Sequence, residues 1–150
     1  MTSRQYATFE VADQLFGLDV AQVQEVLSFH EYTPVPLAPK AVGGLFNLRG
    51  QVIAAVDLRV QLGLPPRDLD GPAMNVIVRT EEESVSLLVD KIGEVIELED
   101  DTFEAPPDTL TGPSRDLITG AFKLDGRLML ALDTTRAIDT SSGHLVDEHG

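Results

Sequence analysis

Two blocks of sequence recur in the same order in both halves of the chain, and this repetition constrains the fold more than any other feature. Residues 20–27 and 89–96 share the pattern V-x-x-[VI]-x-E-V-[LI] at an offset of 69 positions. Residues 44–57 and 120–133 share the longer pattern G-x-F-x-L-x-G-x-[VL]-[IM]-x-A-[VL]-D at an offset of 76 positions. Ordered repeats of this kind indicate repeated structural units. We therefore predict two small units of similar fold.

The local sequence pattern is typical of short β-strands. Apolar, β-branched or alternating segments are separated by turn residues, and helical signals are few. The expected strands are Tyr6–Val11, Leu15–Val20, Gln51–Val56, Met74–Thr80, Ser84–Val89 and Arg127–Leu132. A short helix is predicted over Asp57–Gly63, whereas Val20–Leu27 fits either a short helix or a continued strand. The fold class is thus mainly β, and closing each unit of some five strands into a barrel would remove its unpaired edges.

Residues that both repeats share are expected to be scaffold. Gly50 and Gly126 end the two-residue turns of equivalent hairpins, where a left-handed backbone favours glycine. Asp57 and Asp133 each follow an apolar strand and precede a possible helical turn. We interpret both aspartates as helix N-caps rather than catalytic groups.

The first hairpin differs from its repeat at two positions. Asn47 and Arg49 of the first repeat become Lys123 and Asp125 in the second. Leu48, which lies between them, has a leucine counterpart and is expected in the core. The planar guanidinium of Arg49 suits carboxylate and carbonyl groups of a partner, although a solvated turn arginine is the common alternative. Arg49 is therefore the main candidate for a specialised residue.

The charge balance and composition exclude several classes of function. The 150 residues include 11 basic and 25 acidic residues, a formal net charge of −14, so nucleic acids and anionic membranes are unfavourable partners. Residues 1–75 hold 5 basic and 8 acidic residues, and residues 76–150 hold 6 and 17, so the first half is closer to neutral. Cysteine is absent, which excludes thiolate metal sites and cysteine nucleophiles. Apolar runs do not exceed five residues, against about 20 for a membrane-spanning helix, so we expect a cytosolic protein.

Two groups of polar residues are expected to bind no metal. One is an acidic run that lacks the glycine and spacing of a calcium loop and is interpreted as a solvated face: Glu97, Glu99, Asp100 and Asp101. The other is the set of histidines, which are too scattered for a metal triad: His30, His144 and His149. We predict neither a metal nor a cofactor.

One stretch of the first repeat resembles the signature of CheW, the bacterial chemotaxis coupling (adaptor) protein family. Residues 42–53 read V-G-G-L-F-N-L-R-G-Q-V-I, and V-D-L-R follows at residues 56–59. Further segments fall in the order and near the spacing of the family: Phe16–Val20, Val23–Val26, Pro34–Pro36, Pro39, Val89–Val95 and Gly120–Asp133. The motif match is specific, and the resemblance covers about residues 5–140, which is nearly the whole chain.

The resemblance implies a CheW-like fold of two intertwined SH3-like five-stranded β-barrels with a few short helices. On this basis we expect a first barrel over about residues 14–75 and a second over about residues 76–140. The N-terminal strand, residues 5–12, could be shared between them, and residues 141–150 are expected to form a flexible tail.

The resemblance also implies a function without catalysis. Proteins of this family couple the cytoplasmic hairpin tip of a chemoreceptor, or methyl-accepting chemotaxis protein, to the regulatory domain of a CheA-type histidine kinase. The chain would be cytoplasmic and recruited to membrane-associated chemoreceptor arrays. In the family the receptor tip packs against an apolar groove between the barrels, with the arginine of N-L-R-G at that surface. Receptor binding is thereby assigned to Arg49, with Asn47 and Leu48 beside it and Tyr32 on the preceding loop.

The sequence singles out no kinase-binding residue. Because most of the negative charge belongs to the second barrel, the first barrel is the expected contact for the kinase regulatory domain.

Other functions stay open at this point. A hydrolase or isomerase could use carboxylates such as Asp57, Asp90 and Asp133, provided that two of them were desolvated in one cleft with their pKa values pushed apart. The chain could instead serve a non-flagellar chemosensory array, with pili or another output. A third possibility is a purely architectural protein that oligomerises through its barrels.

Overall fold

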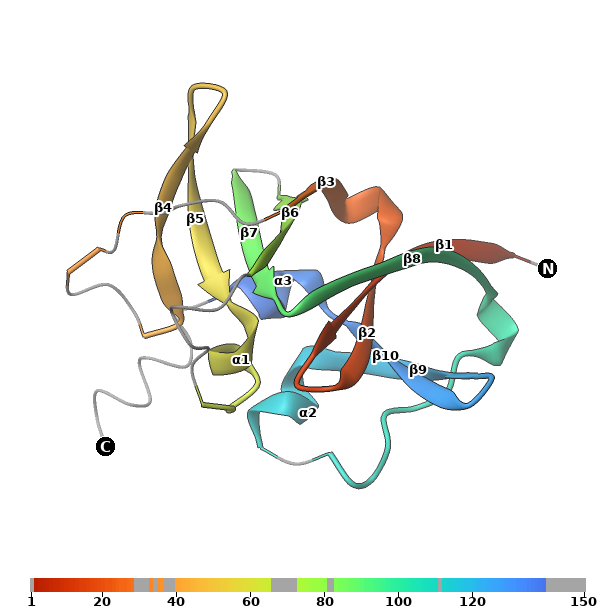
Figure 1. The fold of residues 1–150 in the computed structure, drawn as a ribbon. Helices are drawn as coiled ribbons and strands as arrows, with labels where there is room; N and C mark the ends of the chain where they lie inside the picture. Colours follow the sequence, from red (N-terminus) through yellow and green to blue (C-terminus); the bar gives the residue numbers. More distant parts are fainter. Residues whose placement is uncertain are drawn as a thin grey trace.

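The computed structural model describes residues 2–28, 33, 35–36, 40–65, 73–80, 83–110 and 112–139, and its strands form two five-stranded sheets (Figure 1). One sheet contains β1 (Ser3–Val11), β2 (Gln14–Asp19), β8 (Lys91–Glu99), β9 (Ile118–Leu124) and β10 (Arg127–Leu132). The other contains β3 (Val23–Leu27), β4 (Val42–Leu48), β5 (Gln51–Asp57), β6 (Met74–Arg79) and β7 (Ser84–Val89). Short helical segments lie between the strands: η1 (Val20–Gln22), α1 (Leu58–Gln61), η2 (Asp100–Thr102), α2 (Pro113–Leu117) and α3 (Thr134–Ile138). The predicted mainly β fold with a few short helices is confirmed.

Each sheet is closed into a barrel by a short β-bridge. In each case the chain that follows one edge strand pairs with the strand at the opposite edge. The strand orders are β8-β1-β2-β10-β9 and β3-β6-β7-β5-β4. Thr33, which follows β3, pairs with Leu45 on β4, and Glu104, which follows β8, pairs with Ala121 on β9. Leu45 and Ala121 occupy equivalent repeat positions, so both sheets close in the same way. We call the sheet of β3–β7 the central barrel and the sheet of β1, β2 and β8–β10 the terminal barrel.

The division of the chain between the barrels differs from the expected boundaries. The central barrel takes the strands between Val23 and Val89, whereas the terminal barrel combines residues 3–19 with residues 91–132. A domain boundary between residues 75 and 76 would therefore separate strands that pair with each other. Strand β1, for which sharing between the barrels was left open, pairs with β2 and β8 inside the terminal barrel. The expected tail, residues 141–150, lies outside the described residues.

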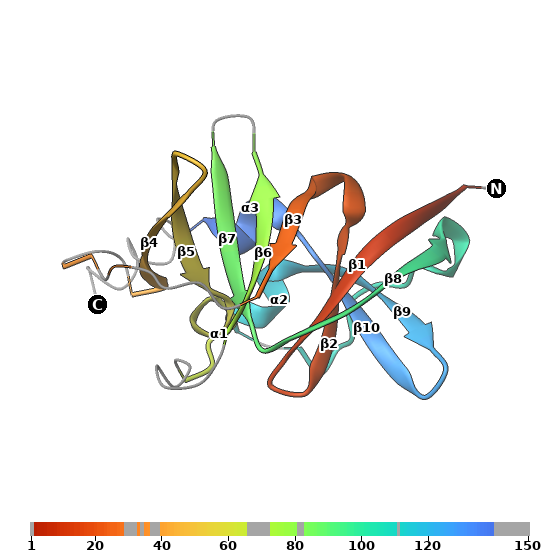
Figure 2. The same cartoon turned by 45° about the horizontal axis from the view of Figure 1, so that its top comes forward.

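The exchange of hairpins between the repeats explains this difference. Each sequence repeat consists of a hairpin followed by three strands, β1–β2 with β3–β5 and β6–β7 with β8–β10. The hairpin joins one barrel and the three following strands join the other. Parallel pairing of β2 with β10 and of β7 with β5 connects the two repeats in each barrel. In Figure 2 the two barrels lie side by side, with β3 and β1 near their border.

The repeated hairpins have the same register. Gly44 pairs with Ala55 in β4–β5, and Gly120 pairs with Ala131 in β9–β10, with a register shift beside each of these pairs. The ambiguous segment Val20–Leu27 contains both predicted alternatives, because η1 occupies its first turn and β3 the rest. The prediction that the repeats form equivalent hairpins is therefore confirmed at the level of strand pairing.

The largest apolar core lies between the barrels. It contains Phe9 and Phe16 from the terminal barrel, with ring centroids 6.0 Å apart, and Val78 and Leu87 from the central barrel. A smaller cluster fills the interior of each barrel, around Ile53 and Phe46 in one and around Met129 and Phe122 in the other. Since burial of apolar surface is the main stabilising term of folding, the barrels depend on each other for stability.

The two predicted N-caps begin equivalent helices. Asp57 accepts a hydrogen bond from the backbone N–H of Arg59 at 3.1 Å, and Asp133 accepts one from the N–H of Arg136 at 3.1 Å. Helix α1 is shorter than the predicted Asp57–Gly63, and a turn that ends at Gly63, with φ of 80°, continues it. Both aspartates are confirmed as structural caps.

Candidate binding surface at the β4–β5 hairpin

The tip of the β4–β5 hairpin is a two-residue turn made of Arg49 and Gly50. Their φ angles are 52° and 87°, and positive φ at both central residues is the pattern of a type I′ turn, whose twist matches that of a hairpin. The Oδ1 atom of Asn47 accepts a hydrogen bond from the N–H of Gly50 at 2.9 Å. The exposed Asn47 thus stabilises the turn that presents Arg49.

The equivalent β9–β10 turn has a different backbone. Gly126 has φ of 81°, which confirms the expected left-handed glycine. Among the described residues, the non-glycine positions with positive φ are Ala12, Asp13 and Arg49, so Asp125 is not left-handed. Arg49 therefore differs from its counterpart in conformation as well as in charge.

Arg49 forms a two-point ion pair with Glu25 on β3. Its Nη1 donates to Glu25 Oε2 at 2.6 Å and its Nη2 donates to Oε1 at 2.9 Å. The hydrogen bond from Arg49 lowers the pKa of Glu25 below its ordinary value, and the same bond raises the pKa of Arg49. The Arg49 side chain stays 68% exposed, whereas that of Glu25 is 23% exposed. The pair orients the guanidinium and leaves much of it open to a partner.

Glu25 is the residue of this surface that the sequence interpretation missed. It recurs as Glu94 in the second repeat, which marked it as scaffold. The available signal was the asymmetry of the hairpin tips: both repeats keep the glutamate, but the tip residue is a cation in the first repeat and Asp125 in the second. An ion pair between this glutamate and the tip residue is therefore possible in the central barrel but not in the terminal barrel.

The other predicted site residues have different environments. Leu48 is buried beside Phe46 in the core of the central barrel, as predicted, so it supports the surface from below. Val52 lies opposite Asn47 in the hairpin and is 63% exposed, which adds an apolar group to the same tip. Tyr32 lies outside the described residues. The structure thus places Arg49, Asn47 and Val52 together at the surface.

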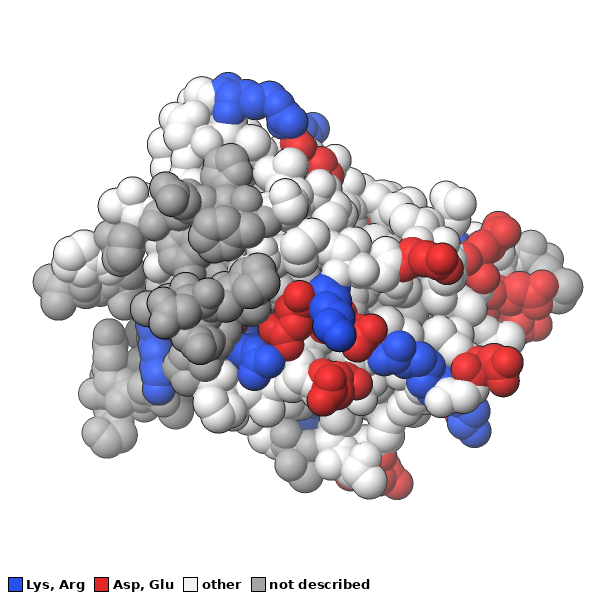
Figure 3. Space-filling view, viewed as in Figure 1, with Lys and Arg blue, Asp and Glu red and all other residues white. Residues whose placement is uncertain are grey.

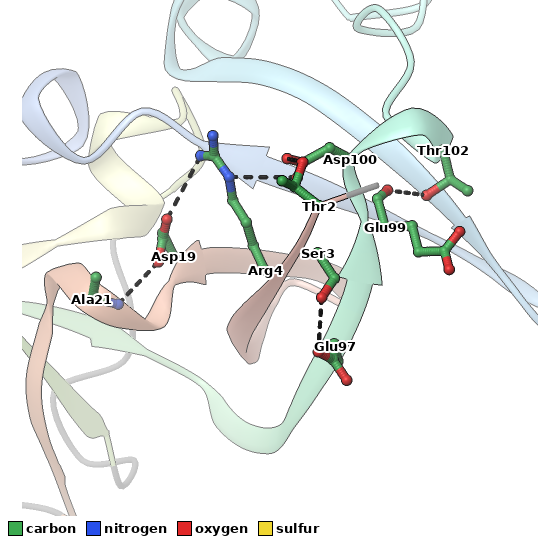
Figure 4. Close-up of polar contacts among 9 residues, drawn as sticks. All are labelled: Thr2, Ser3, Arg4, Asp19, Ala21, Glu97, Glu99, Asp100 and Thr102. Atoms are coloured by element: carbon green, nitrogen blue, oxygen red, sulfur yellow. Dashed lines mark hydrogen bonds and ion pairs between the residues drawn. The ribbon is translucent and has the colours of Figure 1, made fainter.

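Charge is distributed unevenly over the molecule. Figure 3 shows a basic group over the hairpin tip and acidic groups at the opposite end, where β1 begins and β8 ends. At that end Arg4 lies between Asp19 and Asp100, at 3.7 Å and 3.4 Å (Figure 4). The hydroxyl groups of Thr2 and Ser3 donate hydrogen bonds to Asp100 and Glu97. The acidic run is therefore a solvent-facing rim, and two of its carboxylates have partners among residues 2–4.

The candidate catalytic carboxylates have structural partners. Asp57 and Asp133 are the helix caps described above. Asp90 accepts hydrogen bonds from Arg59 at 2.7 Å and 3.2 Å and from the backbone N–H of Ala12 at 2.8 Å. Within the part of the chain that the structure describes, His, Asp and Glu residues form no group of three that could hold a metal ion, and all three histidines lie outside that part.

The described helices are too short to cross a membrane, since the longest have five residues.

Two five-stranded barrels that exchange hairpins and share one apolar core define a single interlocked domain rather than a loose pair of domains. The model of the CheW-like domain matches residues 5–142. The chemotaxis protein CheW of Thermotoga maritima is 30% identical over 136 residues, which cover 88% of this chain and 85% of that protein. The chemotaxis protein CheW of Treponema pallidum is 28% identical over 133 residues, covering 86% and 78%.

A solved structure shares the fold. The scaffolding protein TtCheW of Thermoanaerobacter tengcongensis has a TM-score of 0.80 to this chain at 26% identity, covering 94% of this chain and 91% of that one. The chain belongs to the CheW family, and it is a chemotaxis adaptor of that family.

Proposed function

We propose that this chain is a non-enzymatic adaptor that couples the cytoplasmic tips of chemoreceptors to a CheA-type histidine kinase. The observation that carries the proposal is the match of the CheW-like domain to residues 5–142. The protein would act in the cytoplasm, at membrane-associated receptor arrays. The carboxylates that an alternative hydrolase would need are engaged as caps and in an ion pair, which favours the adaptor.

Receptor binding is assigned to the surface at the β4–β5 hairpin. Arg49 supplies the cation, Asn47 stabilises its turn, and Leu48 anchors the hairpin in the core. Tyr32 keeps the assignment that the family resemblance implies. A receptor tip that presents carboxylate or carbonyl groups can contact the exposed part of the guanidinium while Glu25 holds the other part.

Substitution of Arg49 tests this assignment. Arg49→Asp is expected to weaken binding to a receptor-tip fragment at least about 30-fold, because it replaces an anchoring cation with a repelling charge. Asp125→Arg in the equivalent turn of the terminal barrel is the matched control and should bind as the wild type does. Thermal unfolding and binding are measured on both variants. If the folded Arg49→Asp protein binds the receptor fragment with wild-type affinity, Arg49 is not part of the receptor-binding site.

A charge swap separates receptor contact from structural support. The double variant Arg49→Glu with Glu25→Arg can restore an ion pair inside the protein but moves the cation from the hairpin tip to β3. If Arg49 contacts the receptor, the swap should fold and still bind weakly. Full recovery of receptor binding would show that the pair acts only on the protein's own structure.

The kinase regulatory domain is proposed to bind the central barrel. Residues 23–89, which span this barrel, hold 5 basic and 8 acidic residues, whereas residues 3–19 and 91–132 together hold 5 and 12. The central barrel is thus the less repulsive surface for an acidic partner. Chemical shift mapping with the isolated kinase domain should perturb β3–β7. Shifts restricted to β1, β2 and β8–β10 would contradict this placement.

An architectural protein that only oligomerises is the competing function. Reconstitution with a receptor fragment and a CheA-type kinase distinguishes the two, since an adaptor should change the rate of kinase autophosphorylation when all three components are present. The output of the array, flagella or pili or another system, is identified by co-purification of the native partners.

A further inference from the structure

Arg59 and Asp90 form a partly buried ion pair where the chain passes from the central to the terminal barrel. Asp90 follows the last residue of β7 and precedes the first residue of β8. Arg59, on α1, donates from Nη2 to Asp90 Oδ2 at 2.7 Å and from Nε to Oδ1 at 3.2 Å. The side chains are 27% and 20% exposed. Two parallel bonds of this kind are the strong and directional form of a guanidinium–carboxylate contact.

The same aspartate also holds the first hairpin of the terminal barrel. Its Oδ2 accepts a hydrogen bond from the backbone N–H of Ala12 at 2.8 Å, and its own N–H donates to the carbonyl of Glu10 at 3.0 Å. Ala12 has φ of 51°, a conformation that alanine rarely adopts, so this contact supports an unfavourable backbone. Asp90 therefore joins three segments: α1 of the central barrel, the crossing and the β1–β2 turn of the terminal barrel.

The pair is absent from the repeated scaffold. At the two repeat offsets Arg59 corresponds to Thr135, and Asp90 corresponds to Ala21. The crossing that contains Ala21 has a local cap, in which Asp19 Oδ1 accepts from the N–H of Ala21 at 3.0 Å, and an uncharged hydrogen bond from the Thr134 hydroxyl to Gln22. The two crossings thus differ, and the one at Asp90 carries a charged contact between the barrels.

The apolar core between the barrels is less directional than this contact. Valine and leucine side chains favour burial without prescribing one orientation, whereas hydrogen bonds weaken steeply when their geometry changes. We infer that Arg59 and Asp90 are positioning residues that fix the angle between the two barrels, and that coupling requires this angle. The second part rests on the proposed function, because an adaptor transmits a signal only if its partner contacts keep a fixed geometry.

The angle is measured directly on the full chain by residual dipolar couplings. The variants are Arg59→Gln and Asp90→Asn, and Arg59→Lys keeps the cation without the two-point geometry. The control is Arg136→Gln on the equivalent helix α3, whose Nε is 3.9 Å from Asp133 and whose side chain is 64% exposed. Couplings of both barrels should fit one alignment tensor in the wild type and the control, and two tensors in the Arg59 and Asp90 variants. A shared tensor in a folded Arg59→Lys or Arg59→Gln protein overturns the inference.

A reconstituted assay tests the consequence for coupling. Receptor-fragment affinity should stay within about twofold of wild type in Arg59→Gln, while activation of the kinase by the ternary mixture falls at least fivefold. Unchanged activation in that variant overturns the role in coupling. If the wild type itself activates no kinase, the proposed function fails, whereas the dipolar couplings still decide whether the pair fixes the angle.

Discussion

At the residue scale, Arg49 shows how one side chain is prepared for binding by its own protein. Its left-handed backbone forms the turn at the hairpin tip, and Glu25 fixes the guanidinium from one side. A long, flexible side chain normally loses conformational entropy when a partner immobilises it. Because the ion pair has already restricted Arg49, that loss on binding is smaller, and affinity is correspondingly higher.

The pKa of Glu25 reports on this restraint. The hydrogen bond from Arg49 lowers the pKa below the ordinary value of 4.5, so the carboxylate stays ionised as the pH falls into the range where free glutamates protonate. The contribution of the pair is therefore complete above the unfolded-state pKa and is lost as the pH falls through the lowered one. Carboxyl NMR titration of Glu25 should show this, and Arg49→Gln should return the pKa toward its ordinary value. An unchanged titration in Arg49→Gln would mean that the pair does not persist in solution.

The sequence predicted Arg49, Asn47 and Leu48 but not the contact between Arg49 and Glu25. Repeat comparison detects residues that differ, and Arg49 differs from Asp125. Glu25 has an identical counterpart, Glu94, so it does not stand out in this comparison. The repeats also do not indicate which strand lies beside the hairpin tip. That information comes from the closure of the barrel at Thr33 and Leu45, which is a long-range contact.

At the scale of elements, barrel closure depends on the glycine that starts the second repeated hairpin. A Cβ atom on Gly120 would lie 2.1 Å from the Phe103 ring and 2.5 Å from the backbone oxygen of Glu104. Glu104 is the residue that bridges to Ala121 and closes the terminal barrel. Glycine is therefore required at position 120 because the Phe103 ring and the Glu104 backbone approach it closely, and not because of its own backbone φ angle.

We expect Gly120→Ala to destabilise the protein by about 1–3 kcal/mol, because either the ring and the bridge move or the strand bends. Gly126→Ala is the matched comparison: its φ of 81° is unfavourable for alanine, but its Cβ would meet no atom within 4 Å. That variant should lose about 1 kcal/mol without loosening the bridge. Urea unfolding gives the stabilities, and hydrogen exchange at Glu104 and Ala121 reports the bridge. Slow exchange of both amides in Gly120→Ala would contradict this explanation.

The elements themselves were largely predictable, whereas their membership of a barrel was not. Alternation and turn residues predicted β1, β2, β5, β6, β7 and β10, and the caps Asp57 and Asp133 located two helices. Strands β4, β8 and β9 were not among the expected strands. Pairing of β2 with β10 joins residues more than 100 positions apart, and local sequence pattern does not specify it. The expected boundary near residue 76 followed the repeats, but the exchange of hairpins places strands of both repeats in each barrel.

At the scale of the whole molecule, this exchange makes the two barrels one folding unit. A fragment of residues 1–75 lacks β7 and β8, which pair with β5 and β1 in the full chain. We expect this fragment and the complementary fragment, residues 76–150, to be unfolded when separate and to regain a dispersed NMR spectrum when mixed. A dispersed spectrum from either fragment alone would show that a barrel can form without the other repeat.

The exchanged hairpin also imposes an order of events during synthesis. Strand β1 emerges first from the ribosome, yet its partner β8 is about 90 residues further along the chain, and the parallel partner of β2 lies further still in β10. At typical elongation rates of about 5–20 residues per second, the N-terminal hairpin waits on the order of 5–20 s for its sheet. The central barrel, whose strands are consecutive from β3 to β7, can be completed first. The nascent adaptor therefore presents an N-terminal hairpin with unpaired outer edges for several seconds, and such edges are sites where aggregation begins or chaperones bind.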